Sequence, residues 1–351
     1  MGNMAKYDKN MALQTTISRK DIQFYAADDA CMSLHGVWYE DGKFRRLPED
    51  VAKTVSEGVH YGHSLTAGGR LRFITDSDYI AISVQYGSIE NASTVPVATT
   101  AGFDLYETVD GKQIHRGVFA PPLDVKDKYE SEKTLPGSGE RELTLVFPLY
   151  SEVKALYIGV AEGSTVRPAT DYTYQKPVVY YGSSITHGVC ASRPGNTYPH
   201  QICRELNCDY VSLGFGGNAK GEQEMADYIA TLDMSVFVLD YDYNTPSLEY
   251  LADTHERFFE TVRKANPDLP IVIVSRPKLF TEVEKPRFNI VKATYDHAIA
   301  RGDKNVYFVP GYELITEDVM DTAKVDLAHP NDLGFYFMAK RIGQELRKIL
   351  K

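Results

Sequence analysis

Val178-Val179-Tyr180-Tyr181-Gly182-Ser183-Ser184 joins four consecutive β-type residues to a turn of small and hydroxyl-bearing ones. Further apolar runs of this kind follow in the chain, at 210–213, 236–239, 271–274 and 306–309. Helical patterns alternate with them, at about 196–207, 221–232, 247–265, 286–301 and 331–349. Near-continuous apolar strands separated by helices are typical of a parallel sheet covered on both faces. Right-handed crossovers then give a three-layer α/β/α domain, which we place at residues 177–351.

The preceding half of the chain has a different pattern, because its short runs alternate between apolar and polar residues. A period of two predicts strands with one buried face. Turn signals such as Asp41-Gly42 separate these runs, which lie at 71–74, 79–84, 142–147 and 155–160. Many short strands with turn spacers favour an antiparallel, jelly-roll-like β-sandwich over residues 1–170. Only Pro48–Ser56 shows a helical pattern there, and residues 165–177 are predicted to link the two domains.

Length, composition and charge exclude several classes of protein. The 351 residues suit two domains, at roughly 100–200 residues each. Hydrophobic residues make up 43% and charged residues 25%, which is ordinary for a globular protein. No apolar run approaches the roughly 20 residues of a membrane helix, so a membrane is not expected as a partner. The formal net charge of −10 argues against nucleic acid as a partner, since a polyanion is repelled on average.

The N-terminal residues and the cysteines bear on the cellular compartment. Residues 1–20 lack the apolar stretch of a secretory signal, so we expect a cytoplasmic location, with a truncated secreted form as the alternative. The cysteines form no CxxC pair and show no zinc-site spacing, so no metal is expected there. We expect free, mostly buried thiols at Cys31, Cys190, Cys203 and Cys208.

Small and polar residues follow the predicted strands at the edge where a parallel sheet binds its ligands. Ser184 lies in the turn after the first strand, Gly217 after the second and Asn244 after the third. Asp326 and His329 come just before the last helix. The chain order therefore predicts that these residues meet at one edge of the sheet.

This set of groups is what acyl transfer requires. A serine hydroxyl becomes a good nucleophile when an imidazole takes its proton, and a carboxylate holds that imidazole in place. We therefore interpret Ser184 as the nucleophile, His329 as the base and Asp326 as its partner. The candidate oxyanion donors are the N–H groups of Ser184 and Gly217 and the amide of Asn244. A spacing of three residues does not ensure direct pairing of Asp326 with His329, so the backbone conformation decides it.

The four blocks resemble those of the SGNH hydrolase superfamily, also called GDSL-type esterases, over roughly residues 177–350. Ser184 matches the nucleophile, Gly217 and Asn244 the second- and third-block residues, and Asp326 with His329 the final block. The chain departs from the family in having Gly-Ser-Ser for Gly-Asp-Ser and Asp-Tyr-Asp-Tyr-Asn for Gly-x-Asn-Asp. The resemblance implies a flavodoxin-like α/β/α fold and a serine esterase, whose mechanism needs no metal or organic cofactor.

The upstream half carries Gly102-Phe103-Asp104-Leu105-Tyr106, which resembles the Gly-x-Asp-Leu-Tyr motif of an N-terminal β-domain joined to some SGNH esterases. Similar layouts occur among carbohydrate esterases that remove acetyl groups from glycans. The resemblance implies removal of O-acetyl groups from an oligosaccharide or smaller sugar ester, whereas the residues alone indicate only a serine esterase. It leaves open whether the sandwich binds glycan, caps the site or mediates dimerisation, and whether the chain forms a homo-oligomer.

Several residues also have a plainer interpretation. Ser184 and Asp326 suit helix caps, and Asn244 suits a turn. The glycines at 214–217 suit a phosphate cradle, although the lysine and hydroxyl residues of a P-loop are missing. The His60 and His63 pair is interpreted as surface residues rather than metal ligands.

Three further side chains are candidate substrate contacts. His187 lies three residues after Ser184 and is weighed as a substrate contact before it is weighed as the base. Arg276 follows the fourth strand and suits substrate binding or pairing with a carboxylate. Trp38, the only tryptophan, suits stacking on a sugar, although core packing is the more frequent role.

The function that combines these observations is hydrolysis of small acyl esters, acetyl above all, by a covalent acyl-enzyme route. One alternative is a lipase or thioesterase that acts on longer acyl chains. Another is a non-catalytic glycan-binding protein, which intact blocks at four positions disfavour.

Overall fold

The computed structural model describes residues 15–350, which divide into two compact units. Among these residues, the second unit comprises Leu47–His63, Tyr172–Ser192 and 196–350, and the first contains the others. The predicted bounds place the segment 47–63 in the first domain and the segment 193–195 in the second. In the structure, 47–63 belongs to the second unit and 193–195 to the first. The prediction on an export signal rests mainly on residues 1–14, which lie outside the described residues.

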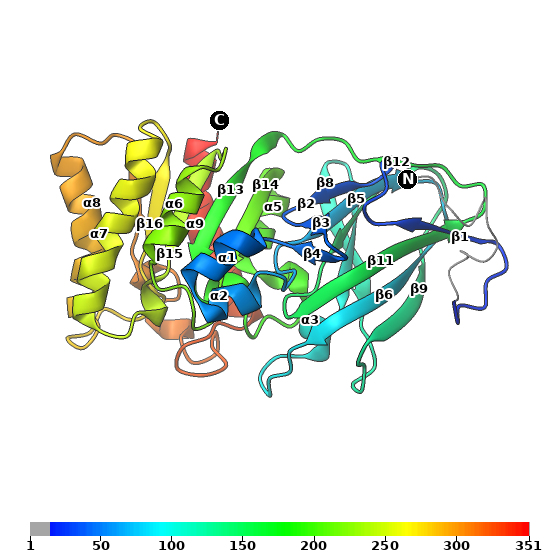
Figure 1. The fold of residues 1–351 in the computed structure, drawn as a ribbon, viewed down its shortest axis with the longest axis horizontal. Coiled ribbons are helices and arrows are strands. Elements are labelled where there is room, and N and C mark those ends of the chain that lie inside the picture. The colour runs from blue at the N-terminus through cyan, green and yellow to red at the C-terminus, as the bar shows by residue number, and fades with distance from the viewer. Residues whose placement is uncertain (1–14, 351) are drawn as a thin grey trace. The chain divides into compact units, whose positions relative to one another are not determined.

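The second unit is built on a five-stranded sheet whose neighbouring strands are all parallel (Figure 1). Its strand order is β14-β13-β15-β16-β17. The chain thus begins at an inner strand, β13, adds β14 at one edge, and then adds β15, β16 and β17 in turn toward the other edge. The strands are β13 (Tyr174–Gly182), β14 (Cys208–Gly214), β15 (Val236–Asp240), β16 (Ile271–Val274) and β17 (Val306–Val309). Each apolar run that the sequence singles out lies in one of these strands, and the predicted α/β fold is confirmed.

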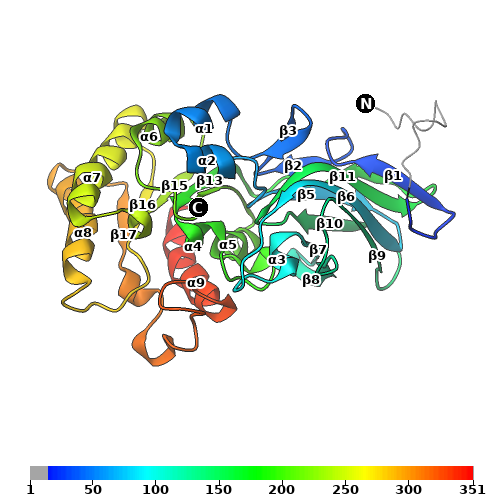
Figure 2. The same ribbon diagram turned by 60° about the horizontal axis from the view of Figure 1, so that its bottom comes forward.

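Adjacent residues of a strand point to opposite faces of the sheet, and each face has its own hydrophobic core. Val179 and Tyr181 pack with α6 (Gln223–Ala230) and α7 (Leu248–Ala265), whereas Val178 and Tyr180 pack with α5 (Tyr198–Leu206) and α9 (Asp332–Ile349). Figure 2 shows the sheet between these two groups of helices, which confirms the three layers. The unit also contains α4 (Ser184–His187) and α8 (Lys285–Ala300).

Two short helices from the first half of the chain complete the second unit. The helical pattern at Pro48–Ser56 forms α1 (Glu49–Val55), and α2 (Glu57–Gly62) follows it directly. Ser56 separates them, because its extended backbone ends α1 while its hydroxyl caps α2 by accepting from the N–H of Val59. Ala52 and Val59 join the same core as α6. The sequence predicted α1 but not α2, since six residues are too few for a recognisable period.

The first unit consists of two antiparallel sheets that share one core. The orders are β1-β11-β6-β9 in one sheet and β12-β5-β10-β7-β8 in the other, where β2 also pairs with β5. Alternate residues such as Ile80 and Ile82 of one sheet and Leu143 and Leu145 of the other fill the core. The predicted β-sandwich is therefore confirmed. Its main strands are β1 (Ile22–Ala26), β5 (Arg70–Thr75), β6 (Tyr79–Ile89), β7 (Phe103–Val109), β8 (Lys112–Phe119), β9 (Lys128–Thr134), β10 (Arg141–Val146) and β11 (Ser151–Ala161).

Short elements complete this unit, and one lies in the predicted linker. Val166 pairs with Thr75, so the first part of residues 165–177 is an edge strand, β12 (Val166–Pro168). The other short elements are β2 (Ser33–His35), β3 (Trp38–Glu40), β4 (Lys43–Arg45) and α3 (Val97–Thr100).

The Gly-x-Asp-Leu-Tyr motif binds the segment 193–195 within the first unit. The buried carboxylate of Asp104 accepts from the backbone N–H of Gly195 at 2.6 Å and from Nη1 of Arg193 at 2.9 Å. The Arg193 guanidinium also donates to the hydroxyl of Tyr106. A Cβ atom at Gly195 would lie 2.1 Å from that hydroxyl, so only glycine fits there. The motif's polar side chains thus have a structural function within the sandwich unit.

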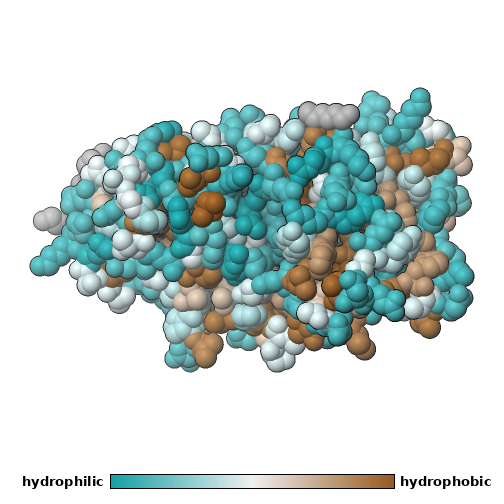
Figure 3. Space-filling view, turned by 180° about the vertical axis from the view of Figure 1, so that it is seen from behind, coloured by the Kyte–Doolittle hydropathy of each residue, from teal (hydrophilic) through white to brown (hydrophobic). Residues whose placement is uncertain are grey.

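The polarity of the surface and the burial of the cysteines are those of a globular protein, as the composition predicts. The face shown in Figure 3 is largely hydrophilic, with hydrophobic side chains in several groups. Among residues 15–350, no helix is long and apolar enough to cross a bilayer. The cysteines are free, as expected; Cys190, Cys203 and Cys208 are buried, and Cys31 is partly exposed.

Candidate active site

Ser184 is the first residue of α4, directly after the turn that follows β13. Ser183 caps this helix, because its hydroxyl accepts from the N–H of Ile185 at 3.2 Å. Gly182 permits the sharp turn, since a Cβ there would lie 2.0 Å from Oγ1 of Thr186. Ser184 is partly exposed while its neighbours on both sides are buried. The turn therefore presents one hydroxyl at the carboxyl edge of the sheet.

The structure brings Ser184, His329 and Asp326 together in a chain of hydrogen bonds. Oγ of Ser184 lies 2.9 Å from Nε2 of His329, and Nδ1 of the same ring lies 2.8 Å from Oδ2 of Asp326. An ionised carboxylate only accepts hydrogen bonds, so Nδ1 carries the proton and Nε2 accepts from the serine hydroxyl. This is the arrangement in which imidazole acts as a base toward serine.

The backbone resolves the question of the three-residue spacing. Oδ1 of Asp326 accepts from the N–H groups of Ala328 and His329, at 2.7 and 2.6 Å, which turns the chain back on itself. The other carboxylate oxygen is thereby aimed at the ring. Partial burial raises the pKa of Asp326, but the bonds from His329 and Ala328 outweigh this effect and lower it to about 2. The carboxylate is therefore ionised near neutral pH.

Two lysines hold the loop that carries Asp326 and His329. Nζ of Lys324 donates to the carbonyl of Pro277 at 2.7 Å, and Lys278 donates to the carbonyl of Leu327 in the opposite direction. Burial lowers the pKa of Lys324 to about 8, and the nearby Lys278 charge adds to this effect. The loop after β16 and the loop before α9 are thus fastened to each other. Neither lysine stood out in the sequence, because each donates to a backbone carbonyl.

The loop after β14 lies beside the serine. A Cβ at Gly216 would contact Cβ of Ser184 at 3.5 Å, and Gly217 has a φ of +70°, which favours glycine. Asn244 donates from Nδ2 to the carbonyl of Phe215 at 3.1 Å, and thereby ties the third block to the second. The blocks predicted from the sequence thus meet at one place.

The helix α2 supports this loop from behind. Asn218 donates from Nδ2 to the carbonyl of Gly216 at 2.7 Å. A Cβ on Gly58 of α2 would lie 1.9 Å from Oδ1 of Asn218. Position 58 therefore accommodates only glycine while Asn218 keeps its bond. A contact between such distant residues leaves no signal in the sequence pattern.

Behind the serine lie two buried carboxyl groups of the third block, Asp240 and Asp242. Burial and, to a smaller extent, the Asp242 charge raise the pKa of Asp240 to about 8, although the bonds from Tyr198 and Thr186 lower it. Burial also raises the pKa of Asp242 to about 6, despite the nearby charges of Arg276 and Arg287. The sequence placed this Asp-Tyr-Asp run at the functional edge but gave its carboxyl groups no role.

The remaining predicted contacts lie in different surroundings. His187 is buried at the end of α4, and the ring next to Ser184 is that of His329. Arg276 donates from Nε to the carboxylate of Glu284 at 2.9 Å. Of its two interpretations, substrate binding and pairing with a carboxylate, the structure shows the second. Trp38 is partly buried in β3 of the first unit, opposite Arg45.

The rings of His60 and His63 stack at 5.2 Å between centroids within the second unit, and His63 is buried, so its interpretation as a surface residue was wrong. Among residues 15–350, no cluster of three His, Cys, Asp or Glu side chains is arranged to hold a metal ion.

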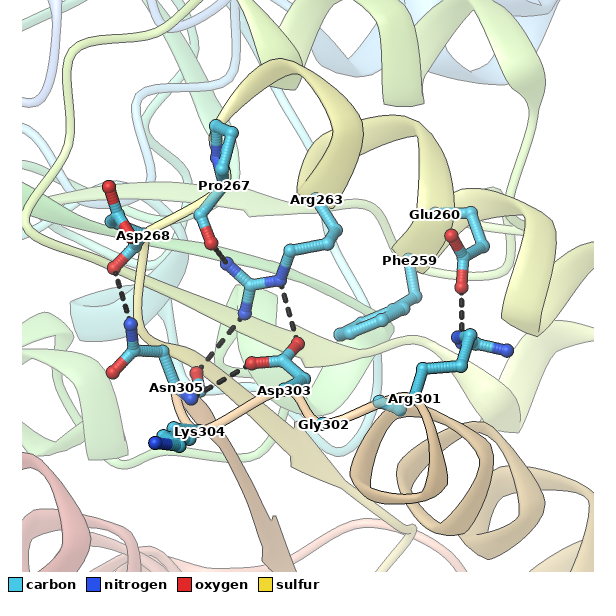
Figure 4. A pocket seen from close by; sticks show the side chains of 11 residues that line it. Phe259, Glu260, Arg263, Pro267, Asp268, Arg301, Gly302, Asp303, Lys304 and Asn305 are labelled. Atoms are coloured by element: carbon cyan, nitrogen blue, oxygen red, sulfur yellow. Dashed lines mark hydrogen bonds and ion pairs between the residues drawn. The ribbon is translucent and has the colours of Figure 1, made fainter.

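A cavity of about 430 Å³ lies at the opposite edge of the sheet, next to the residues that precede β16 and β17 (Figure 4). Its main cation, Arg263, is fully engaged: it bonds to Asp303 at 2.8 Å and to the backbone carbonyls of Asn266, Pro267 and Asn305. Figure 4 shows the bonds from Arg263 to Asp303, Pro267 and Asn305. The cavity thus lies at a junction of loops held by hydrogen bonds, whereas the candidate catalytic residues lie at the carboxyl edge, where parallel sheets bind ligands.

Comparison with known proteins agrees with the geometry. Residues 175–350 match the GDSL-like lipase/acylhydrolase family. The chain belongs to this family. Residues 22–166 match the GxDLY domain, described as the N-terminus of SGNH-hydrolase-type esterases. The family and its fold support hydrolysis of esters as the general activity. No curated protein matches the chain.

Solved structures share the whole two-part chain. A protein described as a GDSL-like lipase from Bacteroides ovatus is 29% identical, with 94% of this chain and 98% of that chain covered and a TM-score of 0.83. A salicylyl-acyltransferase from a tetracycline biosynthetic pathway is 21% identical, with coverages of 95% and 99% and a TM-score of 0.74. An acetyl xylan esterase from Butyrivibrio proteoclasticus is 13% identical, with coverages of 93% and 98% and a TM-score of 0.60. The last two establish similarity of fold.

Proposed function

We propose that this protein is a serine esterase that removes small acyl groups, acetyl above all, from carbohydrates. The observation that carries the proposal is the bonded series Ser184, His329 and Asp326, with distances of 2.9 and 2.8 Å. In this proposal Ser184 is the nucleophile, His329 the general base and then acid, and Asp326 the group that holds the ring.

The first half-reaction forms an acyl-enzyme. Oγ of Ser184 attacks the ester carbonyl carbon while Nε2 of His329 takes the hydroxyl proton. The C–O bond of the ester then breaks, and the imidazolium returns this proton to the departing sugar oxygen. Asp326, held at its low pKa by the loop's own N–H groups, stabilises the imidazolium without taking its proton.

The second half-reaction releases the acid. His329 takes a proton from water, the hydroxide oxygen attacks the acyl carbon, and the Ser184 oxygen leaves with that proton. The oxyanion forms twice, and we assign its stabilisation to the N–H groups of Ser184 and Gly217 and to the amide of Asn244. The position of Gly216 against Cβ of Ser184 supports this assignment, because it brings the loop 214–217 next to the nucleophile residue.

Two observations support the substrate class. Similar folds occur in an acetyl xylan esterase and in a family two carbohydrate esterase from Clostridium thermocellum bound to cellohexaose. The sandwich unit accompanies the catalytic fold across the full length of such proteins. Both make an acetylated glycan the first substrate to test.

The test has two parts. The purified protein and its Ser184→Ala variant are given p-nitrophenyl esters from acetate to decanoate, with Ser235→Ala as a matched control at the other edge of the sheet. We expect the highest turnover with acetate and a loss of several orders of magnitude in Ser184→Ala only. Turnover that rises beyond about C8 favours a lipase or thioesterase, in line with pocket preferences of roughly 1–3 kcal/mol per methylene.

Acetylated oligosaccharides are then screened by mass spectrometry. A decrease in mass of about 42 Da for each ester, which corresponds to replacement of an acetyl group by hydrogen, supports the carbohydrate substrate. Binding of an oligosaccharide without cleavage of any ester would instead point to a glycan-binding protein.

A further inference from the structure

Asp240 ends β15 and lies next to the nucleophile turn. It is paired in register with Gly182, two residues before Ser184. The residue is 4% exposed, and burial of a carboxyl group to this extent is costly unless hydrogen bonds compensate for the lost water. The mechanism proposed above makes no use of it.

The carboxyl group of Asp240 binds both helices that follow the turn. Its Oδ2 accepts from Oγ1 of Thr186 in α4 at 3.0 Å and from the hydroxyl of Tyr198 in α5 at 2.9 Å. The two hydroxyl oxygens lie 3.2 Å apart, so three oxygens form a closed triangle. Thr186 and Tyr198 are themselves almost completely buried. This triangle excludes water and gives each group a defined direction.

The helix α4 needs such an anchor. It has four residues, and helices this short are not stable through their own hydrogen bonds. Ser184 and Thr186 lie in the same single turn of helix, two residues apart. A displacement of the backbone at Thr186 therefore also moves the backbone at Ser184. The orientation of Ser184 therefore depends on hydrogen bonds from side chains of α4 to other helices and strands.

We propose that Asp240 is a positioning residue that, through Thr186 and Tyr198, directs the hydroxyl of Ser184 toward Nε2 of His329. The inference rests on the proposed function for its kinetic test, but its structural test is independent of activity. It assigns a role to the Asp-Tyr-Asp departure in the third block, which the family blocks do not explain.

The charge state of Asp240 selects the diagnostic variant. Burial raises its pKa to about 8, and the other carboxyl group of the same segment, Asp242, has a raised pKa as well. Tyr198 faces it from α5 with a pKa held far above the usual range by burial. Asp240 is thus a neutral acid near pH 7, and asparagine is its closest mimic, because an amide oxygen accepts both hydroxyl groups.

The kinetic test compares removal of the bonds with their conservation. We expect Asp240→Leu to lower kcat for p-nitrophenyl acetate by about 100-fold with little change in KM, as misdirection of a reacting group does. Thr186→Val should lower kcat by about tenfold, and the double variant no more than Asp240→Leu alone, since both act through one anchor. Asp240→Asn should restore most of the activity.

The matched control is Thr294→Val. Thr294 is as buried as Thr186, and its valine variant likewise loses a buried hydroxyl contact, the one to Nδ1 of His255 at 2.8 Å, but it lies in α8. We expect similar melting temperatures for the two valine variants and a loss of kcat only in Thr186→Val. Equal kinetics in the two variants would overturn the proposal.

A crystal structure of Thr186→Val, or of Tyr198→Phe if that variant folds better, gives the structural test. We expect the separation of Ser184 Oγ and His329 Nε2 to exceed about 3.5 Å, beyond hydrogen-bond range. An unchanged separation overturns the inference even if the protein hydrolyses no ester. If the separation is unchanged but Ser184→Ala still loses its activity, the inference fails while the proposed function stands, so the two failures are distinguishable.

Discussion

The hydroxyl oxygen of Ser184 lies 2.9 Å from Nε2 of His329, although 145 positions separate the two residues in the chain. One stands at the start of a helix after the first strand of the parallel sheet, and the other in the loop before the last helix. Parallel strands place such connections at one edge, and the contact follows from the topology. The fold thus brings the two residues together, and local hydrogen bonds orient their side chains.

Asp326→Asn tests the role of the carboxylate. The amide offers an N–H to Nδ1 of His329 and thereby favours the tautomer with the proton on Nε2, which is unable to accept from Ser184. We expect kcat to fall by about 10³- to 10⁴-fold, as when a triad histidine is held in the wrong tautomer. The measurement is kcat for p-nitrophenyl acetate near pH 7.

Asp321→Asn is the control for this prediction, because Asp321 is exposed in the same loop and bonds only to Thr322 among the described residues. It should retain wild-type kcat. Comparable losses in both variants would mean that the loop, rather than the carboxylate at 326, responds to the change of charge.

The stability of the protein should fall as the pH rises toward 8 because of Asp240. The folded group keeps its proton up to about pH 8, whereas the unfolded group releases it near the ordinary value of 3.8. Unfolding therefore releases a proton between these values, and the free energy of unfolding decreases with each pH unit. Asp240→Asn removes this dependence, so its stability relative to the wild type should increase from pH 5 to pH 9.

Urea unfolding at these two pH values measures the effect. Asp242→Asn is the companion variant, since its carboxyl has a raised pKa of about 6 and should show most of its effect at lower pH. A stability difference between wild type and Asp240→Asn that stays constant across the range contradicts a raised pKa at Asp240.

The sequence predicted the sheet and the blocks because both have local signals. Val178–Tyr181 is apolar throughout, as a strand buried on both faces must be, and Ser184 follows it directly. The layers were predictable too, since crossovers between parallel strands have one hand. Asp326 and His329 were found because their position before the last helix places them at the same edge.

What the sequence did not predict depends on contacts between distant residues. The helix α2 is too short for a period, and its contact from Gly58 to Asn218 spans the two halves of the chain. The segment 193–195 joins the first unit through Asp104, a residue recognisable only as part of a motif. The direct bond from Asp326 to His329 required the backbone turn at Ala328, which spacing alone does not determine.

Lys278→Met and Lys324→Met should loosen the loop that carries Asp326. Each substitution removes one donor to a backbone carbonyl of the facing loop and leaves the carbonyl without that bond. We expect kcat to fall by about tenfold for each, and the double variant to be less than additive, because the bonds fasten the same pair of loops.

Lys292→Met is the matched control, since Lys292 pairs only with Asp296 on the exposed side of α8 in the described chain. Limited proteolysis adds a second measurement, with faster cleavage at 321–330 expected in the two loop variants. Wild-type kcat in both loop variants would show that the lysines do not support the catalytic geometry.

Gly58→Ala should impair activity more than stability. The new Cβ would lie 1.9 Å from Oδ1 of Asn218, the end of a side chain that can rotate away, so the fold tolerates it. Rotation breaks the bond from Asn218 to the carbonyl of Gly216, and with it the support of the loop beside Ser184. We expect kcat to fall several-fold, on the order of 1 kcal/mol in the barrier, with KM nearly unchanged.

Gly343→Ala separates this effect from the general result of placing alanine in a helix. A Cβ at Gly343 in α9 would meet Cγ1 of Ile202 at 3.5 Å, an ordinary contact, and should stabilise the helix by up to about 1 kcal/mol. Its kcat should equal that of the wild type. If Gly58→Ala retains full kcat while a crystal structure shows Asn218 rotated, the bond from Asn218 to Gly216 is not needed for catalysis, and the loop holds its shape through Phe215 and Asn244 alone.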